Sequence, residues 1–402
     1  RAKHGISVNK DGTIRYDCSE LPITHFKPHE ISVSIKKLKE YGYTEDIHGE
    51  PLERKDQICE MKVQDIIIPC CDEAIEDPAD DVLLKTCNFI DDLLQRMYGL
   101  EPYYNASKRE DLVGKLVIGL APHTSAGIVC RIIGFHKGQT FNAHPYVHAA
   151  MRRDCDGDET GFILLLDGFL NFSNTYLPNS RGSTMDAPLV LTSRIISTEV
   201  DDMIFNMDVV SEYPLELYEA SDEMKMPWDV DIEVVEDRIG KPNQYQDMGF
   251  THDTTDINEG VRVSAYKTLP SMDEKVEAQM DLAVKIRAVD QADVAKIMIN
   301  KHFIRDTKGN LKKFSLQQFR CVHCNTKYRR PPLQGSCEEC GGKVIFTISE
   351  GSITKYMDLS LSLANKYNIE PYTKQVLDLT QQRIEGVFGR EKEVQSGLDD
   401  FF

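Results

Sequence analysis

The spacing of hydrophobic and polar residues along the chain predicts several helices. Apolar residues at helical spacing predict a helix over residues 31–42, where Gly42 ends the run. A second helix is predicted over 82–100, with one apolar face made of Val82, Leu83, Cys87, Ile90, Leu93, Leu94 and Met97. Two further helices are expected around 273–300 and 352–368.

Strand signals lie between these helices. Residues 58–69 are rich in Ile and Val and end at a proline, and residues 115–135 combine apolar runs with glycine turns. Residues 187–196 read as another strand, and 161–177 form a long apolar element. The mixture predicts an α+β fold, with irregular strands in the middle third and helices toward the C-terminus.

Composition places the chain among ordinary globular proteins. Its 402 residues are 41% hydrophobic and 28% charged, enough for two or three domains. No run of about 18 apolar residues is present, so no membrane span is expected. The first residue is not Met, which favours a cut end within a longer polypeptide. Eleven cysteines, mostly scattered through apolar or helical segments, favour a reducing cytoplasm over a disulfide framework.

The charge is unevenly distributed. A net charge of -18 argues against a chain that coats nucleic acid over its whole surface, but binding depends on local patches. Residues 301–330 carry one acid, Asp306, against nine basic residues: Lys301, Arg305, Lys308, Lys312, Lys313, Arg320, Lys327, Arg329 and Arg330. This segment predicts a phosphate-facing surface, with a solvated basic face as the alternative.

The segment "RRDCDGDE" crowds Asp154, Asp156 and Asp158 beside two arginines. Adjacent carboxylates repel one another unless a positive charge lies between them. A helix-loop-helix calcium site is excluded, because counting from Asp154 its sixth position is Glu159 instead of glycine and its twelfth is Leu165 instead of glutamate.

Magnesium fits these aspartates better than calcium does. Mg²⁺ is commonly held by one or two carboxylates, with substrate phosphates and waters completing the octahedron. Two such ions about 4 Å apart activate a hydroxyl and stabilise a leaving pyrophosphate. Gly157 gives the loop backbone freedom, and Arg152 and Arg153 have the planar guanidinium that matches phosphate. A solvated acidic turn is the alternative.

Two histidines precede this loop. His144 and His148 lie four residues apart in "HPYVH". One interpretation gives them contacts to template, nucleotide or metal; the other makes them structural residues on a shared helical face.

A four-cysteine pattern occurs later in the chain. The two CxxC pairs are separated by twelve residues and consist of Cys321, Cys324, Cys337 and Cys340. Four thiolates at this spacing predict one closed, structural zinc site without an open position for catalysis. A redox role is the alternative. The neighbouring Arg320, Lys327, Arg329 and Arg330 suit a DNA backbone, with a subunit interface as the competing use.

The chain ends in "QSGLDDFF". Gln395, Leu398, Phe401 and Phe402 match the QxxLxxFF pattern by which replication proteins dock onto a sliding clamp. One helical turn brings the Leu and the Phe pair to the same side. A frayed terminus is the alternative.

Long motifs give the chain a family resemblance. "APHTSAGIVCRIIGF" (121–135), "NAHPYVHAAMRRDCDGDE" (142–159) and "LPITHFKPHEISVSIKKLKEYGYTEDIHG" (21–49) closely resemble the large, catalytic subunit of the archaeal D-family DNA polymerase. The resemblance runs from residue 1 to about 388 and covers only the C-terminal part of that subunit.

The resemblance implies a double-psi β-barrel core akin to that of multisubunit RNA polymerases, with helical segments and a zinc ribbon-like module. It places the metal-binding aspartates at Asp156 and Asp158. The family usually has Asn where this chain has Asp154. Asp154 could therefore be a third metal ligand, a group that supports the ligands, or a repelling negative charge that Arg152 or Arg153 relieves. Basic residues of a partner barrel lie outside this chain, which implies that the chain alone is inactive.

The expected divisions are a connector (1–107), the catalytic barrel (108–270), a helical region (271–316), a zinc module (317–350), C-terminal helices (351–389) and a clamp-binding tail (390–402). The predicted activity is DNA-directed DNA polymerisation with two Mg²⁺ ions and one Zn²⁺. The implied partners are primer–template DNA with dNTP, a small proofreading exonuclease subunit, the N-terminal portion of the large subunit and the sliding clamp. A non-catalytic replisome assembly module and an RNA polymerase-like nucleotidyltransferase are the alternatives.

Overall fold

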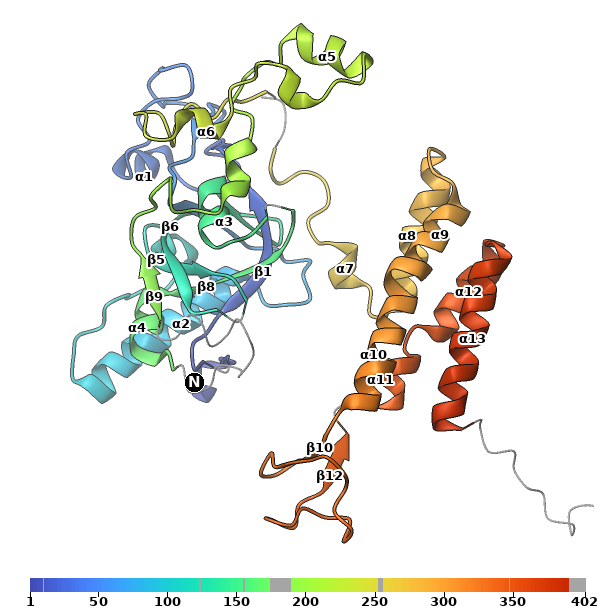
Figure 1. The fold of residues 1–402 in the computed structure, drawn as a ribbon. Coiled ribbons are helices and arrows are strands. Elements are labelled where there is room, and N and C mark those ends of the chain that lie inside the picture. Colours follow the sequence, from blue (N-terminus) through green and yellow to red (C-terminus); the bar gives the residue numbers. More distant parts are fainter. Residues whose placement is uncertain are drawn as a thin grey trace, which may run out of the picture. The chain divides into compact units, whose positions relative to one another are not determined.

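The computed structural model describes residues 1–389 except 10, 123, 155, 174–188, 252–255 and 347. The chain divides into two compact units, Arg1–Thr268 and Leu269–Phe402, and Figure 1 labels many of their elements. This boundary lies next to the one expected at residue 270.

Six strands of the first unit close into a barrel. They are β1 (Tyr16–Pro22), β4 (Asp65–Pro69), β5 (Leu116–Leu120), β6 (Ala126–His136), β7 (Thr140–Ala143) and β8 (Glu159–Leu164). Their order is β4-β7-β1-β8-β5-β6, and β6 pairs again with β4. The pairings β1–β7 and β4–β6 are parallel, and the other four are antiparallel. Closure leaves no free edge within this ring, and β9 (Val190–Thr192) adds to β6 outside it.

The barrel corrects one expected division. A connector over 1–107 would end before the catalytic barrel, yet β1 and β4 are barrel strands that precede residue 108. Ser19, for example, pairs with Thr140. Pairing between strands far apart in the sequence does not affect local periodicity. The sequence pattern therefore placed β1 and β4 in a different division from the strands with which they pair.

The barrel interior is filled by aromatic and β-branched side chains. The ring of Phe162 lies 5.5 Å from that of Tyr16 and 5.7 Å from that of Phe141, between centroids. All five residues of β4, "DIIIP", are buried. The predicted strand over 58–69 is thus confirmed at its C-terminal half. Its N-terminal half holds β3 (Cys59–Glu60), which pairs with β2 (His25–Phe26) in a separate small sheet.

The predicted helix over 82–100 forms, but its last turn differs. The helix α2 (Ala79–Leu93) buries Leu83, Cys87 and Ile90 as expected. A π-helical turn then spans Leu94–Tyr98, and the side chain of Met97 is 74% exposed. The wider turn rotates the following residues away from a face predicted with 3.6 residues per turn. Met97 therefore lies outside the core.

The remaining elements of the first unit are short. The helix α1 (Ile35–Glu40) occupies the second half of the predicted range 31–42, because Ser34 caps it by accepting the N–H of Lys37. The others are α3 (Pro145–Ala150), α4 (Leu165–Asn171), α5 (Leu215–Asp222), α6 (Val235–Arg238), α7 (Ala265–Thr268) and 3-10 turns at Ala2–His4, Arg109–Leu112, Asp202–Asn206 and Pro227–Asp229.

The second unit is helical, with a small three-stranded sheet. Its elements are α8 (Met272–Ile286), α9 (Gln291–Met298), a π turn (Ile299–Phe303), α10 (Ile304–Leu316), β10 (Phe319–Cys321), β11 (Lys327–Tyr328), β12 (Val344–Phe346), α11 (Glu350–Thr354), α12 (Met357–Lys366) and α13 (Pro371–Phe388). The expected helix near 273–300 is divided by Arg287, whose backbone is left-handed with φ 59°. Among the described residues, no helix is long and apolar enough to cross a membrane.

Candidate functional site

The acidic segment forms the loop between α3 and β8. His144 precedes α3 and caps it, because its Nδ1 accepts the N–H of Tyr146, and Pro145 follows at the first helical position. The helix ends as Arg152 adopts a left-handed backbone with φ 59°. Gly157 has φ 96° and open space where a Cβ would lie, so the loop turns at the residue best suited to that backbone.

The three aspartates of the loop differ in exposure and contacts. Asp154 and Asp156 are exposed, whereas Asp158 is half-buried. Nη1 of Arg153 lies 3.2 Å from Oδ2 of Asp158. This ion pair differs from the expectation that both arginines serve phosphates alone. The guanidinium of Arg153 compensates the negative charge of Asp158, five residues away. Arg152 is exposed.

The loop fits a cation that brings part of its own ligand shell. In the part of the chain that the structure describes, two groups of three or more metal-binding side chains gather within 4.8 Å, and the loop aspartates are in neither. The carboxylates therefore do not form a closed cage. They do present exposed, hard oxygen donors, which suits Mg²⁺ held by one or two carboxylates together with phosphates and water.

One of those two groups lies elsewhere in the first unit and consists of His29, Glu30 and Asp256. The carboxylate of Glu30 already accepts N–H groups from Lys27 at 2.7 Å and from Ile257 at 3.3 Å. These hydrogen bonds join the backbone near residue 27 to that near residue 257, so the cluster fits a structural role.

Both histidines before the loop are buried. His144 and His148 have exposed fractions of 0%, and burial lowers the pKa of His144 to about 3. Neither side chain faces solvent from which a nucleotide would arrive, so burial favours the structural interpretation. Nδ1 of His148 lies 2.9 Å from Oε2 of Glu20, which is equally buried.

Glu20 was missed by the sequence analysis. It lies on β1 at an inward position, two residues after the buried Cys18 and four after the buried Tyr16. A charged residue in register with the apolar positions of a strand is the signal that could have identified it.

The second metal-binding group is the four-cysteine cluster of the second unit. Sγ of Cys321 lies 3.4 Å from that of Cys340, and Sγ of Cys324 lies 3.4 Å from that of Cys337. Four thiolates about 2.3 Å from a tetrahedral zinc ion would be about 3.8 Å apart, close to these separations. Oη of Tyr328 lies 3.1 Å from Sγ of Cys337, and this hydrogen bond lowers the pKa of Cys337 to about 6. The donor set fits one structural zinc ion.

The basic segment 301–330 exposes all nine of its Lys and Arg side chains. Arg305, Lys308 and Lys312 follow one another along α10 at intervals of three and four residues, so they share one helical face. Arg329 and Arg330 are exposed after β11. The second unit therefore presents cations on a helix and beside the cysteine cluster.

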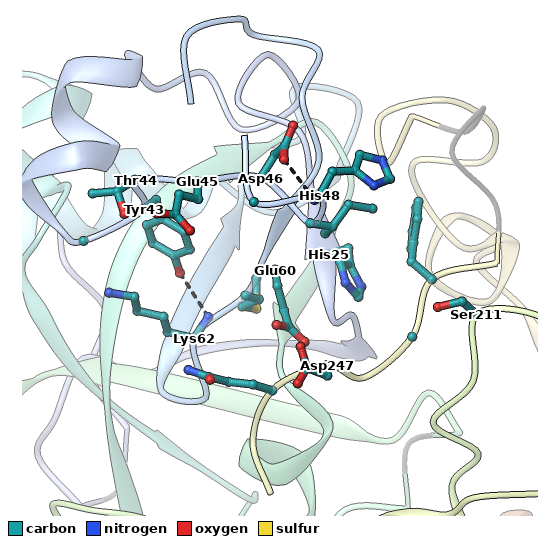
Figure 2. Close-up of a pocket in the computed structure, with 17 residues that line it drawn as sticks. His25, Tyr43, Thr44, Glu45, Asp46, His48, Glu60, Lys62, Ser211 and Asp247 are labelled. Atoms are coloured by element: carbon teal, nitrogen blue, oxygen red, sulfur yellow. Dashed lines mark hydrogen bonds between the residues drawn. The ribbon is translucent and has the colours of Figure 1, made fainter. Parts of the chain in front are cut away.

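A cavity of the first unit lies away from the acidic loop. This hollow has a volume of about 640 Å³. Figure 2 shows the residues that line it, among them 42–49, 60–62, Gln246, Asp247, Gly249 and Phe250. The side chains of His25, Glu60 and Lys62 border it, but none of the loop aspartates does. Gln395, Leu398, Phe401 and Phe402, which the sequence pattern predicts to bind a clamp, lie outside the described residues.

The fold and the loop together define a barrel protein with an exposed acidic loop whose oxygen donors suit a cation carrying phosphate. Residues 1–275 match the family model of the DNA polymerase II large subunit DP2, catalytic domain. The chain therefore belongs to the DNA polymerase II large-subunit family, as its resemblance predicted.

Curated relatives are similar along almost the whole chain. The DNA polymerase II large subunit of Pyrococcus furiosus is 55% identical over 390 residues, which cover 96% of this chain and 30% of the relative. That of Methanocella arvoryzae is 52% identical over 404 residues, covering 100% of this chain and 35% of the relative. That of Natronomonas pharaonis is 49% identical, with 100% and 33% covered. The chain thus spans about a third of the length of these relatives.

Proposed function

We propose that this chain is the catalytic part of a DNA-directed DNA polymerase. The primer 3′-hydroxyl oxygen attacks the α-phosphorus of a dNTP, the bond from that phosphorus to pyrophosphate breaks, and the hydroxyl proton leaves. The observation that carries this proposal is the exposed acidic loop on a closed barrel, in a chain about half identical to proteins named DNA polymerase II large subunit.

Asp156 and Asp158 are the proposed ligands of two Mg²⁺ ions, with Asp154 assisting. Bound Mg²⁺ would polarise the phosphates and favour deprotonation of the primer hydroxyl. Exposed Asp156 could turn toward such an ion, and Asp158 could bind it through Oδ1 or by giving up the contact of its Oδ2 with Arg153. The guanidinium of Arg153 would then be able to bind the phosphates together with that of exposed Arg152.

The proposed barrel topology is the double-psi arrangement implied by the family resemblance. Six strands that close with two parallel and four antiparallel pairings are compatible with it. A double-psi barrel is defined by the way in which the connections between its strands cross, and we propose that crossing for this chain.

The four cysteines are the proposed ligands of one structural Zn²⁺. Zinc would fix the loops on which Arg329 and Arg330 stand, and we assign these two residues, with the basic face of α10, to the DNA backbone. Contact with a partner subunit is the competing use of this module.

The proposed partners are primer–template DNA, dNTP, a small proofreading exonuclease subunit, the rest of the large subunit and the sliding clamp. A chain that spans about a third of its relatives is expected to need them. The second candidate function is a non-catalytic assembly module, favoured by the clamp-docking pattern at 395–402.

Primer extension distinguishes these functions. The chain assembled with the remaining large-subunit polypeptide and the small subunit is expected to extend a primer with dNTPs, and the chain alone is not. Extension with NTPs in preference to dNTPs would instead support the RNA polymerase-like alternative. Correct assembly without any extension would support the assembly module.

The tail can be tested separately from catalysis. Phe401→Ala combined with Phe402→Ala should weaken binding to the sliding clamp at least about 100-fold, because each buried Phe contributes about 1.5–3 kcal/mol. Surface plasmon resonance with immobilised clamp measures the loss. Ser396→Ala, at a variable position of the pattern, should bind like the unmodified chain. Equal affinity of the Phe double variant would contradict clamp docking through this segment.

A further inference from the structure

Two residues hold the two ends of the acidic loop by their main chains. The N–H of Arg153, where the loop leaves α3, donates to the carbonyl of His148 at 3.0 Å. The N–H of Glu20 donates to the carbonyl of Asp158 at 2.9 Å, just before β8 begins. The separation of the loop ends therefore depends on the relative position of His148 on α3 and Glu20 on β1.

The side chains of these two residues meet beneath the loop. Nδ1 of His148 lies 2.9 Å from Oε2 of Glu20, and both side chains are 0% exposed. The ring of Phe141, on the neighbouring strand β7, stands edge-on to His148 at 5.8 Å between centroids. Packing against Phe141 thus limits rotation of the His148 ring. The contact between His148 and Glu20 joins α3 to β1 at one position.

This contact is better suited to fixing a position than to adding stability. Among the described residues, neither carboxylate oxygen of Glu20 and neither ring nitrogen of His148 makes a hydrogen bond of regular geometry, even across their 2.9 Å contact, and each such buried group costs about 1–3 kcal/mol. A well-packed apolar pair of similar volume is often as stable as a buried ion pair or more so. Apolar side chains can pack at several relative positions, whereas separating Glu20 from His148 would leave two buried polar side chains without their close contact.

We propose that Glu20 and His148 are a positioning pair for the acidic loop. By fixing the relative position of α3 and β1, the pair sets the distance between the loop ends, so that Asp156 and Asp158 reach a divalent cation together. This inference rests on the proposed function, in which those aspartates bind the metal. Neither Glu20 nor His148 touches the cation or the nucleotide.

The test measures metal binding by the full chain without DNA synthesis. Mn²⁺ binding is followed by electron paramagnetic resonance on zinc-loaded protein, and the signal lost in Asp156→Asn plus Asp158→Asn defines the loop site. Glu20→Gln and His148→Gln are each expected to weaken binding at the loop site by about 10- to 100-fold, the usual effect of removing a group that orients a metal ligand. In the assembled polymerase, the same variants should need correspondingly more Mg²⁺ for half-maximal extension.

Two further variants separate positioning from stability. Glu20→Leu with His148→Phe replaces the pair by apolar side chains, and should retain the unfolding midpoint yet bind Mn²⁺ weakly. Asp65→Asn removes one partner of another barrel ion pair, in which Nη2 of Arg131 lies 2.7 Å from Oδ2 of Asp65. It should lower the unfolding midpoint and leave Mn²⁺ affinity unchanged.

The possible failures are distinguishable. If the unmodified chain gives no Mn²⁺ signal that depends on Asp156 and Asp158, the metal site and the positioning pair are both overturned. If that signal is present but both Gln variants and the Leu/Phe variant bind Mn²⁺ as tightly as the unmodified chain, the positioning pair alone is overturned.

Discussion

Replacing Asp156 and Asp158 together by Asn is expected to reduce primer extension by the assembled polymerase at least about 10³-fold. Asn keeps the size of each side chain but removes the negative charge that a Mg²⁺ ligand needs. Metal ions contribute several kcal/mol of charge stabilisation to phosphoryl transfer, and about 4 kcal/mol corresponds to three orders of magnitude in rate. Single-turnover extension at saturating dNTP measures the change.

This expectation separates chemistry from folding because the loop is at the surface. Asp156 is exposed and Asp158 half-buried, so neither substitution removes core packing, and the unfolding midpoint of the double variant should stay close to that of the unmodified chain. Primer–template affinity should change little, since the nine exposed cations of residues 301–330 are untouched. Undiminished extension by the double variant would refute the assignment of these aspartates.

Asp154→Asn is the matched control at the third carboxylate. The family usually has Asn at this position, and the exposed side chain of Asp154 has room to remain outside the metal shell. Extension by this variant is expected to stay within about fivefold of the unmodified complex, about 1 kcal/mol. A loss as large as that of the double variant would make Asp154 a full ligand.

Local patterns predicted the elements that depend on nearby residues. The strand β5 lies inside the predicted range 115–135 and β6 ends one residue beyond it, and α2 buries Leu83, Cys87 and Ile90 as its periodicity indicated. The prediction that Met97 is buried was wrong, because a π turn changes the number of residues per turn and the apolar spacing does not indicate such a change. The spacing of apolar residues therefore predicts that a helix forms more reliably than it predicts the geometry of its last turn.

The candidate site depended on contacts that no local pattern records. The acidic loop and the cysteine pairs could be recognised because their chemistry is concentrated within a few residues. Glu20 carries only the weaker signal of a charged residue in register with apolar strand positions, because its contact with the loop depends on a strand pairing in which Ser19 lies opposite Glu159. The burial of His144 and His148 likewise follows from where β1 and β7 pass in the barrel, and not from their own spacing.

The largest structural effect is expected at the cysteine cluster. Cys337→Ser should lower the zinc content from about one ion per chain to nearly none, because a structural site needs all four ligands. Structural zinc contributes about 10–16 kcal/mol in small zinc-binding peptides at neutral pH. Cys337 is buried, and Oη of Tyr328 lies 3.1 Å from its sulfur.

Loss of zinc should unfold the module locally and leave the rest of the chain folded. None of the four cysteines belongs to the hydrophobic core of the second unit, which Val276, Met280 and Leu377 help to form. Trypsin should therefore cut the Cys337→Ser variant rapidly after Lys327 and Arg329, while helical circular dichroism remains. Cys71→Ala, at a buried cysteine of the first unit, should keep zinc and resist cleavage there. Full zinc content in the Cys337→Ser variant would contradict a four-thiolate site, because three thiolates would then suffice to hold the ion and leave a position open to solvent.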